Sequence, residues 1–268
     1  MGLKVEHVNK TYGTKKVVND ISFEIDKPSV YGLLGTNGAG KTTTIRMILG
    51  ILKKDSGEIS WNGKEVKRKN VNFGYLPEER GVYPKTKIYD QMMYFAELKG
   101  MKKEKAIEAL NYWAKRLEVE QYINMTPEKL SKGNQQKIQF ITSIIHNPEL
   151  VVLDEPFSGL DPVNTEILKS VIIELIKNGK YIIMSSHQMH SIEEFCSDVL
   201  ILNKGETVLK GNLKQIKEQY NANRVSLSTV ENVDKYIEEL GLKIYNSKDN
   251  DYIININGEE DGYKLINK

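Results

Sequence analysis

The sequence predicts an α/β protein in which a mixed β-sheet forms the core, with an antiparallel β subdomain and an inserted helical subdomain. Three observations support this fold class. Two short, continuous apolar runs at 150–153 and 181–184 are typical of parallel strands that are buried on both faces. A glycine-rich loop at 35–42 follows a strand-like run and precedes a helix-like one. Residues 87–121 repeat apolar side chains every three or four positions, which is the spacing of amphipathic helices.

The N-terminal region alternates short β-branched runs with turns, a pattern that favours strands paired in an antiparallel sheet. These runs are 3–8, 17–18 and 21–25. Residues 59–66 contain Asn62-Gly63 between two strand-like halves. This dipeptide is a hairpin signal because both residues tolerate positive φ.

Residues 35–42 read Gly-Thr-Asn-Gly-Ala-Gly-Lys-Thr, a loop that is suited to bind a triphosphate. Glycines let successive backbone N–H groups turn inward and form an anion-binding nest. Lys41 would supply a point charge for the outer phosphates, and the hydroxyl of Thr42 could bind Mg²⁺. The helix that follows would direct its positive N-terminal end at the phosphates. We therefore expect a P-loop NTPase fold in which ATP contacts Gly35, Thr36, Asn37, Gly38, Ala39, Gly40, Lys41, Thr42 and Thr43.

Two carboxylates directly follow the apolar run at 150–153. Asp154 could hold the Mg²⁺ shell, and Glu155 is placed to polarise an attacking water as general base. A phosphate loop requires both an acid for the metal and a group that activates water. We therefore interpret the two motifs as halves of one site that binds ATP and Mg²⁺.

The later part of the chain contains further strand, helix and turn signals. Pro162 suits the first turn of a predicted helix over 163–178, and Asn203-Lys-Gly205 separates two strand-like runs as a hairpin turn. We expect one domain at 1–220, with its helical subdomain at about 81–146.

A small α+β accessory domain is expected at 221–268, with the order β-α-β-β. These residues hold nine acidic and six basic side chains, a net charge of −3 that leaves +5 for the rest of the chain. We recognise no catalytic residue in this part of the sequence.

Composition excludes several classes of protein. The chain has 268 residues, a net charge of +2 and a pI of about 8.3, so its basic bias is too weak to predict nucleic-acid binding. The single cysteine, Cys196, excludes an internal disulfide and is expected to pack in the core from a short helix at 191–196. No secretory signal and no apolar run long enough to span a bilayer is present. We expect a soluble, cytoplasmic protein that reaches a membrane only through a partner.

Further motifs resemble those of ATP-binding-cassette (ABC) ATPases. Residues 130–138, Leu-Ser-Lys-Gly-Asn-Gln-Gln-Lys-Ile, resemble the signature segment of that family. Tyr12 resembles the aromatic residue on which adenine stacks, 158–161 resemble the loop after the acidic strand, and His187 resembles the switch histidine. Taken alone, Tyr12 would be a surface tyrosine and His187 an ordinary packed or exposed side chain. Together with the phosphate loop and the two carboxylates, the motifs appear in the family's order.

The resemblance implies that two such cassettes, either two copies or one copy with a relative, dock head to tail and bury two ATP molecules. Glu155 would drive hydrolysis together with Lys41 and His187, and Asp161 would connect the two sites across the dimer seam. At the start of a helix that runs to about Asn147, the signature would bind the γ-phosphate held by the opposite subunit. Its binding residues are Ser131, Gly133 and Asn134.

Two departures from the family pattern bear on the site. Glu78 stands where most members carry Gln, and since a carboxylate can bind Mg²⁺ as an amide oxygen does, we hypothesise that Glu78 contacts the metal in the closed state. In the signature, Lys132 replaces the usual second glycine and Asn134 replaces Gln. Because Ser131 and Gly133 remain, we expect phosphate binding across the dimer to remain as well.

Residues 76–84 and 130–137 resemble segments of the sodium-efflux group of bacterial exporter ATPases, which work with separate membrane permeases. The resemblance implies an ATPase that lies on the inner face of the cell membrane and contacts its permease through residues 79–100. Candidate contacts, which could equally pack within the helical subdomain, are Tyr83, Met92, Met93 and Tyr94. Two alternatives remain open: a non-transport ABC ATPase that acts on ribosomes or DNA, and a switch that signals by binding ATP.

Overall fold

The computed structural model describes residues 2–67, 71–79, 81–187, 193–219, 224–248 and 250–266. The chain divides into two compact units, Met1–Gly211 and Asn212–Lys268. The second unit therefore begins earlier than the boundary expected after residue 220, and it includes helix α7 (Leu213–Gln219). The expected boundary itself, between residues 220 and 221, lies outside the described residues.

A six-stranded sheet forms the centre of the first unit, in the order β10-β9-β3-β8-β7-β6. Its strands are β3 (Val30–Gly35), β6 (Phe73–Leu76), β7 (Leu150–Asp154), β8 (Tyr181–Ser186), β9 (Cys196–Asn203) and β10 (Glu206–Asn212). The four neighbouring pairs from β9 to β6 are parallel. All five residues of β7 are buried, which confirms the prediction of parallel strands covered on both faces.

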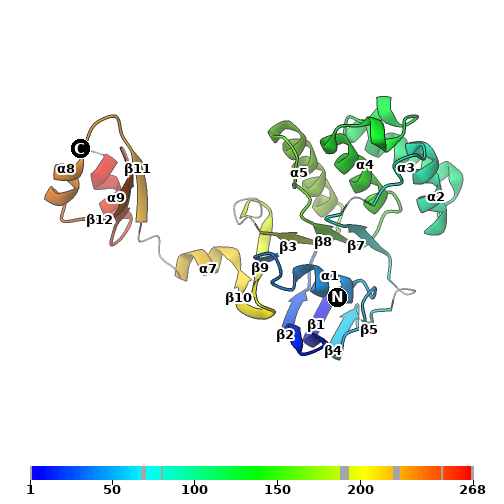
Figure 1. Cartoon of the computed structure of the whole chain (residues 1–268), viewed down its shortest axis with the longest axis horizontal. Helices are drawn as coiled ribbons and strands as arrows, with labels where there is room; N and C mark the ends of the chain where they lie inside the picture. Colours follow the sequence, from blue (N-terminus) through cyan, green and yellow to red (C-terminus); the bar gives the residue numbers. More distant parts are fainter. Residues whose placement is uncertain are drawn as a thin grey trace. The chain divides into compact units, whose positions relative to one another are not determined.

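The second sheet is antiparallel, as predicted, in the order β2-β1-β4-β5. Its strands are β1 (Leu3–Tyr12), β2 (Lys15–Ile25), β4 (Ser56–Trp61) and β5 (Lys64–Glu65). Asn62 and Gly63 form the expected turn, with φ of 50° and 75°. Helix α1 (Lys41–Ile48) lies between the two sheets, and its Ile45 and Ile48 join their common core (Figure 1).

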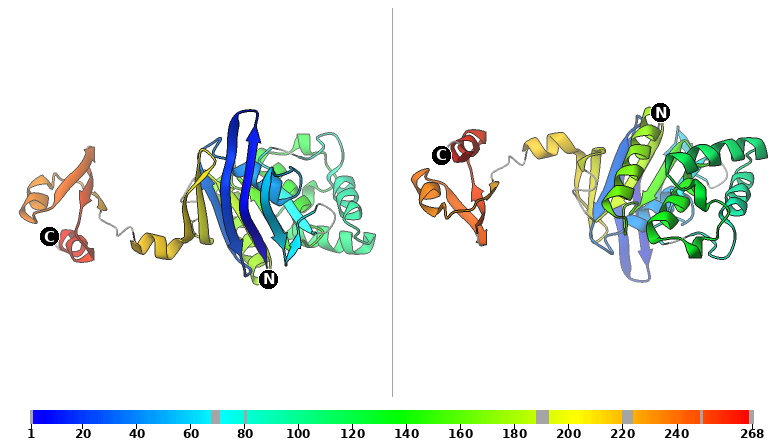
Figure 2. Two further views of the ribbon diagram at one scale, coloured as in Figure 1. Left: turned by 90° about the horizontal axis from the view of Figure 1, so that it is seen from below. Right: turned by 90° about the horizontal axis from the view of Figure 1, so that it is seen from above.

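The other helices of the first unit lie around the large sheet (Figure 1). Between β6 and β7 the chain forms α2 (Ile88–Leu98), α3 (Lys103–Arg116) and α4 (Lys132–Ile144), with short 3₁₀ turns at Glu120–Tyr122 and Pro127–Lys129. These helices gather beside the β6 edge of the large sheet, and α5 (Pro162–Lys177) covers the sheet face opposite α1 (Figures 1 and 2). No helix in the described part of the chain is both long and apolar enough to cross a lipid bilayer.

Three sequence-based expectations require correction. Met92 and Met93 are 0% and 7% exposed, so these two side chains pack inside the helical subdomain and do not form a docking surface. Helix α4 ends at Ile144 and does not extend to Asn147. Cys196 begins strand β9, where it pairs with Val30 of β3, and does not end a helix; residues 191 and 192 of the expected helix lie outside the described residues. The thiol is buried as expected, and burial raises its pKa.

The second unit is a small α+β structure with its own core. Its strands β11 (Arg224–Ser228), β12 (Lys243–Lys248) and β13 (Asp251–Asn255) form an antiparallel sheet in the order β11-β13-β12. Besides α7, the unit contains helices α8 (Asp234–Glu239) and α9 (Glu259–Ile266). Its buried core is formed by Ile237, Leu242, Tyr252, Ile254 and Ile256. The order β-α-β-β corresponds to the elements expected from the sequence, which did not indicate α9.

Candidate nucleotide site

The glycine-rich loop connects the end of β3 to the start of α1, at the edge of the sheet where β7 and β8 also end. Residues 36–43 line a cavity of about 300 Å³, together with Val17 and Glu78. Parallel strands bring their carboxyl ends to one edge of a sheet, which is where open α/β folds bind ligands. The loop predicted to hold phosphates therefore borders a cavity at the expected edge.

Gly40 shows why this loop requires glycine. The residue precedes α1 with φ of 104°, and a Cβ built on it would lie 2.7 Å from the backbone oxygen of Val17. Both the left-handed backbone and the close approach to β2 exclude a side chain. The backbone of the loop can therefore face the cavity directly.

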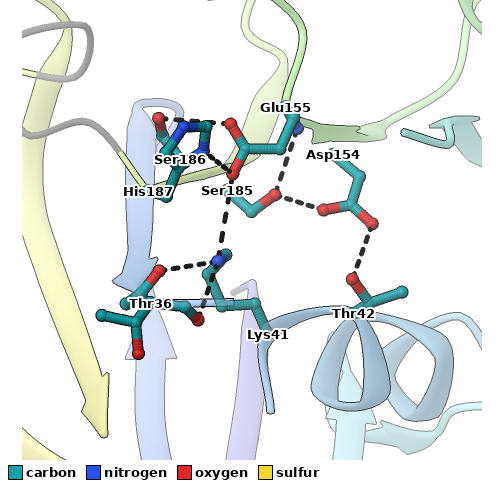
Figure 3. A network of polar contacts seen from close by, with 9 residues as sticks. Thr36, Lys41, Thr42, Asp154, Glu155, Ser185, Ser186 and His187 are labelled. Carbon is teal, nitrogen blue, oxygen red and sulfur yellow. Dashed lines mark hydrogen bonds and ion pairs between the residues drawn. The ribbon is translucent and has the colours of Figure 1, made fainter. Parts of the chain in front are cut away.

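Lys41 is buried, with 7% of its surface exposed. Its ammonium group donates to the backbone oxygens of Gly35 at 2.7 Å and Thr36 at 3.3 Å, and lies 3.9 Å from Oε1 of Glu155. Figure 3 shows this side chain directed from the loop toward Glu155. A buried cation is thus held by acceptors at the point where a phosphate would bind.

Thr42 and Asp154 are joined directly, although 112 positions separate them in the sequence. The Thr42 hydroxyl donates to Oδ2 of Asp154 at 3.1 Å. The other carboxylate oxygen, Oδ1, accepts a hydrogen bond from the hydroxyl of Ser185, and Asp154 is 1% exposed (Figure 3). Burial and the neighbouring Asp154 carboxylate raise the pKa of Tyr75 to about 12, so this phenol stays neutral beside the site.

Glu155 follows β7 in a left-handed backbone conformation, with φ of 51°. Its N–H group donates to both the hydroxyl of Ser185 at 3.2 Å and its backbone oxygen at 3.3 Å. Glu155 is 7% exposed; Oε1 lies 2.9 Å from Nδ1 of His187, and Oε2 accepts from the hydroxyl of Ser186 at 3.4 Å. A non-glycine residue in this conformation costs on the order of 1 kcal/mol, and such strain is typical of functional positions.

The structure therefore brings together Lys41, Thr42, Asp154, Glu155 and His187, which the sequence places in three distant segments (Figure 3). A second cavity of about 320 Å³ lies beside them, lined by residues 155–160, Ser186 and His187.

The sequence analysis did not identify Ser185 or Ser186 as site residues. Both are buried, and they end a buried parallel strand at the edge that carries the two carboxylates. Buried polar side chains are expected to have hydrogen-bond partners, so two serines at this strand end could have indicated their position near the site.

Ser131 and Asp161 belong to a second group, at the N-termini of α4 and α5, and neither is among the residues that line the phosphate cavity. Ser131 caps α4 by accepting from the backbone N–H of Asn134 at 3.3 Å. A Cβ on Gly133 would lie 3.1 Å from the side-chain amide of Asn164, so the two helix starts are in contact. Asp161 caps α5 through the backbone and side-chain amides of Asn164, which hold its pKa below the usual value.

The two remaining candidates are surface residues. Tyr12 ends β1, is 51% exposed, and has the ammonium group of Lys10 5.5 Å from its ring centroid. Glu78 is exposed in the loop after β6, and it is one of the residues that line the phosphate cavity.

The oxygen donors at this edge fit Mg²⁺. The Thr42 hydroxyl and the Asp154 carboxylate lie side by side, and Glu78 borders the same cavity. Within the described ranges, no three His, Cys, Asp or Glu side chains form a metal-binding group by themselves. A hydroxyl and one or two carboxylates beside a phosphate cavity suit Mg²⁺, which is usually held by one or two carboxylates together with water and substrate phosphates.

Comparisons with known proteins show the family to which the chain belongs. Residues 18–158, just over half of the chain, match the family described as ABC transporter. The ABC transporter ATP-binding protein YhaQ of Bacillus subtilis (strain 168) is 51% identical over 226 residues, which cover 84% of this chain and 76% of YhaQ. The ABC transporter ATP-binding protein MJ1023 of Methanocaldococcus jannaschii is 49% identical over 214 residues, or 80% of this chain and 79% of that protein.

A solved structure of the ATP-binding subunit of an ABC transporter superposes with a TM-score of 0.76 at 29% sequence identity. The superposition covers 82% of this chain and 93% of the other. The fold, the phosphate loop with its two carboxylates, and the sequence relatives lead to one conclusion. The chain belongs to the ABC transporter family, as an ATP-binding subunit with ATPase activity.

Proposed function

We propose that this ATPase subunit powers export through a separate membrane permease and works as one of a pair of cassettes. The observation that carries the proposal is the convergence of Lys41, Asp154 and Glu155 at one edge of the sheet, beside the phosphate-loop cavity. A strand end with only a structural role would not require a buried carboxylate on a left-handed backbone, 3.9 Å from a buried ammonium group.

ATP would bind with its phosphates in the loop. The ammonium group of Lys41 would exchange the neutral backbone oxygen of Gly35 for negatively charged phosphate oxygens, which adds the attraction between opposite charges to the hydrogen bond. Thr42, Asp154 and Glu78 are the residues proposed to hold Mg²⁺, which neutralises phosphate charge when bound. Tyr12, exposed at the end of β1, is the proposed platform for adenine.

Glu155 would act as the general base. Its carboxylate would accept a proton from water as the water oxygen bonds to the γ-phosphorus and the bond from that phosphorus to the β–γ bridging oxygen breaks, releasing ADP and phosphate. His187, 2.9 Å from Oε1, would orient the carboxylate and the water. Lys41 would stabilise the negative charge that develops on the phosphoryl oxygens.

The second cassette would complete the site. Ser131 is exposed at the N-terminus of α4, and the first N–H groups of a helix together with its dipole attract a phosphate. The γ-phosphate bound by a facing cassette supplies that charge. Asp161 already has a local role as the N-cap of α5, and its contact across the dimer seam is proposed in addition to it.

The permease would contact the exposed aromatic side chains of the helical subdomain. Tyr83 and Tyr94 are 54% and 52% exposed. Both lie against Phe95, with ring centroids 6.1 Å and 5.7 Å apart. Tyrosine suits such a surface because its ring is apolar and its hydroxyl stays hydrated. This docking would hold the protein at the cytoplasmic face of the membrane.

Replacement of the general base tests the proposal. We expect Glu155→Gln to lower steady-state phosphate release by roughly 10²- to 10⁴-fold, the usual contribution of acid–base catalysis, while ATP binding persists. In this variant, ATP should convert the protein from monomer to dimer in light scattering, and Ser131→Ala should weaken that dimer. Full turnover by an obligate monomer, unchanged by Ser131→Ala, would contradict the paired mechanism.

A non-catalytic switch is the competing function. It predicts that the wild-type protein, isolated with its permease, forms the ATP-dependent dimer but releases no phosphate above the Glu155→Gln level. A ribosomal or DNA-associated role predicts that affinity isolation from cell extracts recovers ribosomal protein or DNA instead of a permease with several membrane spans.

A further inference from the structure

The side chain of Gln139, in the middle of α4, forms hydrogen bonds with the loop that carries Glu78. Gln139 is 4% exposed. Its amide nitrogen donates to the backbone oxygens of Pro77 at 3.1 Å and Glu79 at 3.0 Å, the residues on either side of Glu78. Because a primary amide has two hydrogens, these two bonds use its full donor capacity. The backbone around Glu78 is therefore fixed to α4 on both sides.

A second buried glutamine on the same helix makes an equivalent contact. Gln136, 8% exposed, donates to the backbone oxygen of Pro156, which directly follows Glu155. Gln136 and Gln139 are three positions apart, so their side chains leave α4 on the same face. Helix α4 thus contacts the loops of both acidic residues that border the site, Glu78 and Glu155.

Helix α4 is also packed directly on the strand that leads to Glu78. A Cβ on Gly74 of β6 would lie only 2.1 Å from the backbone oxygen of Ser143 in α4. Two elements in such close contact move together, since a tightly packed interior resists small relative displacements. Helix α4 is therefore in direct contact with both strand β6 and the loop that carries Glu78, and we expect the three to move together.

We propose that Gln139 is a positioning residue that couples the phosphate cavity of one cassette to the signature end of its own α4. The same helix carries Ser131 at its N-terminus and holds the backbone around Glu78 through Gln139. A displacement of Glu78 on binding of ATP would move the helix that completes the facing site. This inference rests on the proposed function, because it requires a facing cassette to receive Ser131.

The first experiment measures the site within one cassette. The probe is a fluorescent ATP analogue, bound with and without Mg²⁺ to the Glu155→Gln protein and to Gln139→Met and Glu78→Ala versions of it. Methionine keeps the length of glutamine and removes both donors. We expect each substitution to weaken Mg²⁺-dependent binding by about tenfold, equivalent to about 1.4 kcal/mol. Binding without Mg²⁺ should change less than twofold, which also shows that the variants are folded.

A double-mutant cycle separates positioning from general packing. If Gln139 acts through Glu78, the double variant should bind no more than about twofold more weakly than Glu78→Ala alone. If Gln139 only stabilises the fold, the two effects should multiply to about a hundredfold, and the proposal is wrong. Gln139→Glu, which keeps the shape but replaces the donor with an acceptor, should reproduce the Met variant and serves in its place if that one does not fold.

Gln91 provides a matched control. It is also buried, at 3% exposed, and its side chain bonds the same connecting segment at the backbone of Tyr83 and Thr86, away from Glu78. We expect Gln91→Met to leave Mg²⁺-dependent binding unchanged. An equal loss in Gln91→Met and Gln139→Met would assign the effect to general loosening of the segment and overturn the proposal.

The second experiment measures the coupling across the pair. Light scattering of the Glu155→Gln protein gives the ATP concentration that produces half-maximal dimer, and Gln139→Met should raise it at least tenfold. If Ser131→Ala has no effect on this dimer, the paired mechanism itself fails. If Ser131→Ala weakens the dimer and Gln139→Met does not, the mechanism stands and the role of Gln139 is wrong. If Glu78→Ala leaves the Mg²⁺-dependent binding of the analogue unchanged, the metal role of Glu78 is wrong. The effect of Gln139→Met on the ATP concentration for half-maximal dimer then decides whether Gln139 couples the cavity to Ser131.

Discussion

Ser185→Ala should destabilise the protein by about 2 kcal/mol, although the change removes a single oxygen atom. Ser185 is fully buried, and its hydroxyl donates to the Asp154 carboxylate while it accepts from the N–H group of Glu155. A hydrogen bond to a charged group contributes about 1.5–3 kcal/mol. In the variant, the N–H group of Glu155 keeps a second acceptor, the backbone oxygen of Ser185 at 3.3 Å. The lost hydrogen bond from this N–H group to the Ser185 hydroxyl therefore adds little to the cost. The cost therefore arises mainly at Asp154.

Urea unfolding followed by tryptophan fluorescence measures this loss. The chain has two tryptophans, Trp61 and Trp113, and both belong to the first unit, so the signal reports the unit that contains the site. With a slope near ~2 kcal/mol per M urea, the midpoint should fall by about 1 M.

Ser143→Ala is the matched control for this measurement. Ser143 is 3% exposed, and its hydroxyl donates to a neutral helix carbonyl, that of Phe140, at 2.7 Å. Its loss should cost about 1 kcal/mol or less, because a neutral hydrogen bond contributes less than a charged one. If the two alanine variants shift the midpoint equally, Ser185 does not support Asp154 in the way that we infer.

Three further predictions concern the loop, the metal and pH. Thr42→Ala should raise the Mg²⁺ concentration for half-maximal phosphate release about tenfold or more. Thr42→Ser should keep the wild-type concentration, because serine retains the hydroxyl that lies beside Asp154. Gly40→Ala should cost about 2 kcal/mol or more in urea unfolding, whereas Gly38→Ala, with φ of 79° and nothing near its added Cβ, should cost about 1 kcal/mol; equal losses would refute the contact with β2. Burial, with a smaller contribution from Lys99, lowers the pKa of His146 to about 4, so between pH 6.5 and pH 4 the unfolded chain binds more protons than the folded one. The free energy of unfolding should therefore fall by up to about 3 kcal/mol as pH drops through this window, and His146→Gln should flatten that dependence in urea titrations at pH 7 and pH 5.

The sequence predicts which residues lie together at the candidate site where each motif is local. The phosphate loop occupies eight consecutive residues, and Asp154 and Glu155 directly follow a buried strand, so each motif carries its own structural context. Parallel pairing of β3, β8 and β7 then brings the motifs to one edge. That pairing explains why residues as distant as Thr42 and Asp154 could be assigned to one site before their contact was known.

Sequence patterns fail where a role depends on which elements pack together. Gln136 and Gln139 look like polar positions on an amphipathic helix, and only the packing of α4 against two loops shows that both are buried donors. Met92 and Met93 are adjacent on α2, so helical periodicity alone does not show that both are buried. The start of β9 at Cys196 likewise depends on its pairing with Val30 of β3.

The order of the strands explains why one helix can contact the loops that carry Glu78 and Glu155. Strands β6 and β7 are neighbours at one edge of the sheet, and Glu78 and Glu155 follow their respective carboxyl ends. Helix α4, inserted between these strands in the sequence, packs against β6 at Gly74 and reaches the loops after both strands with side chains one turn apart. If β6 lay elsewhere in the sheet, no single helix turn could contact both loops. The position of β6 beside β7 therefore lets one helix contact the loops that carry Glu78 and Glu155 and also carry Ser131 at its N-terminus.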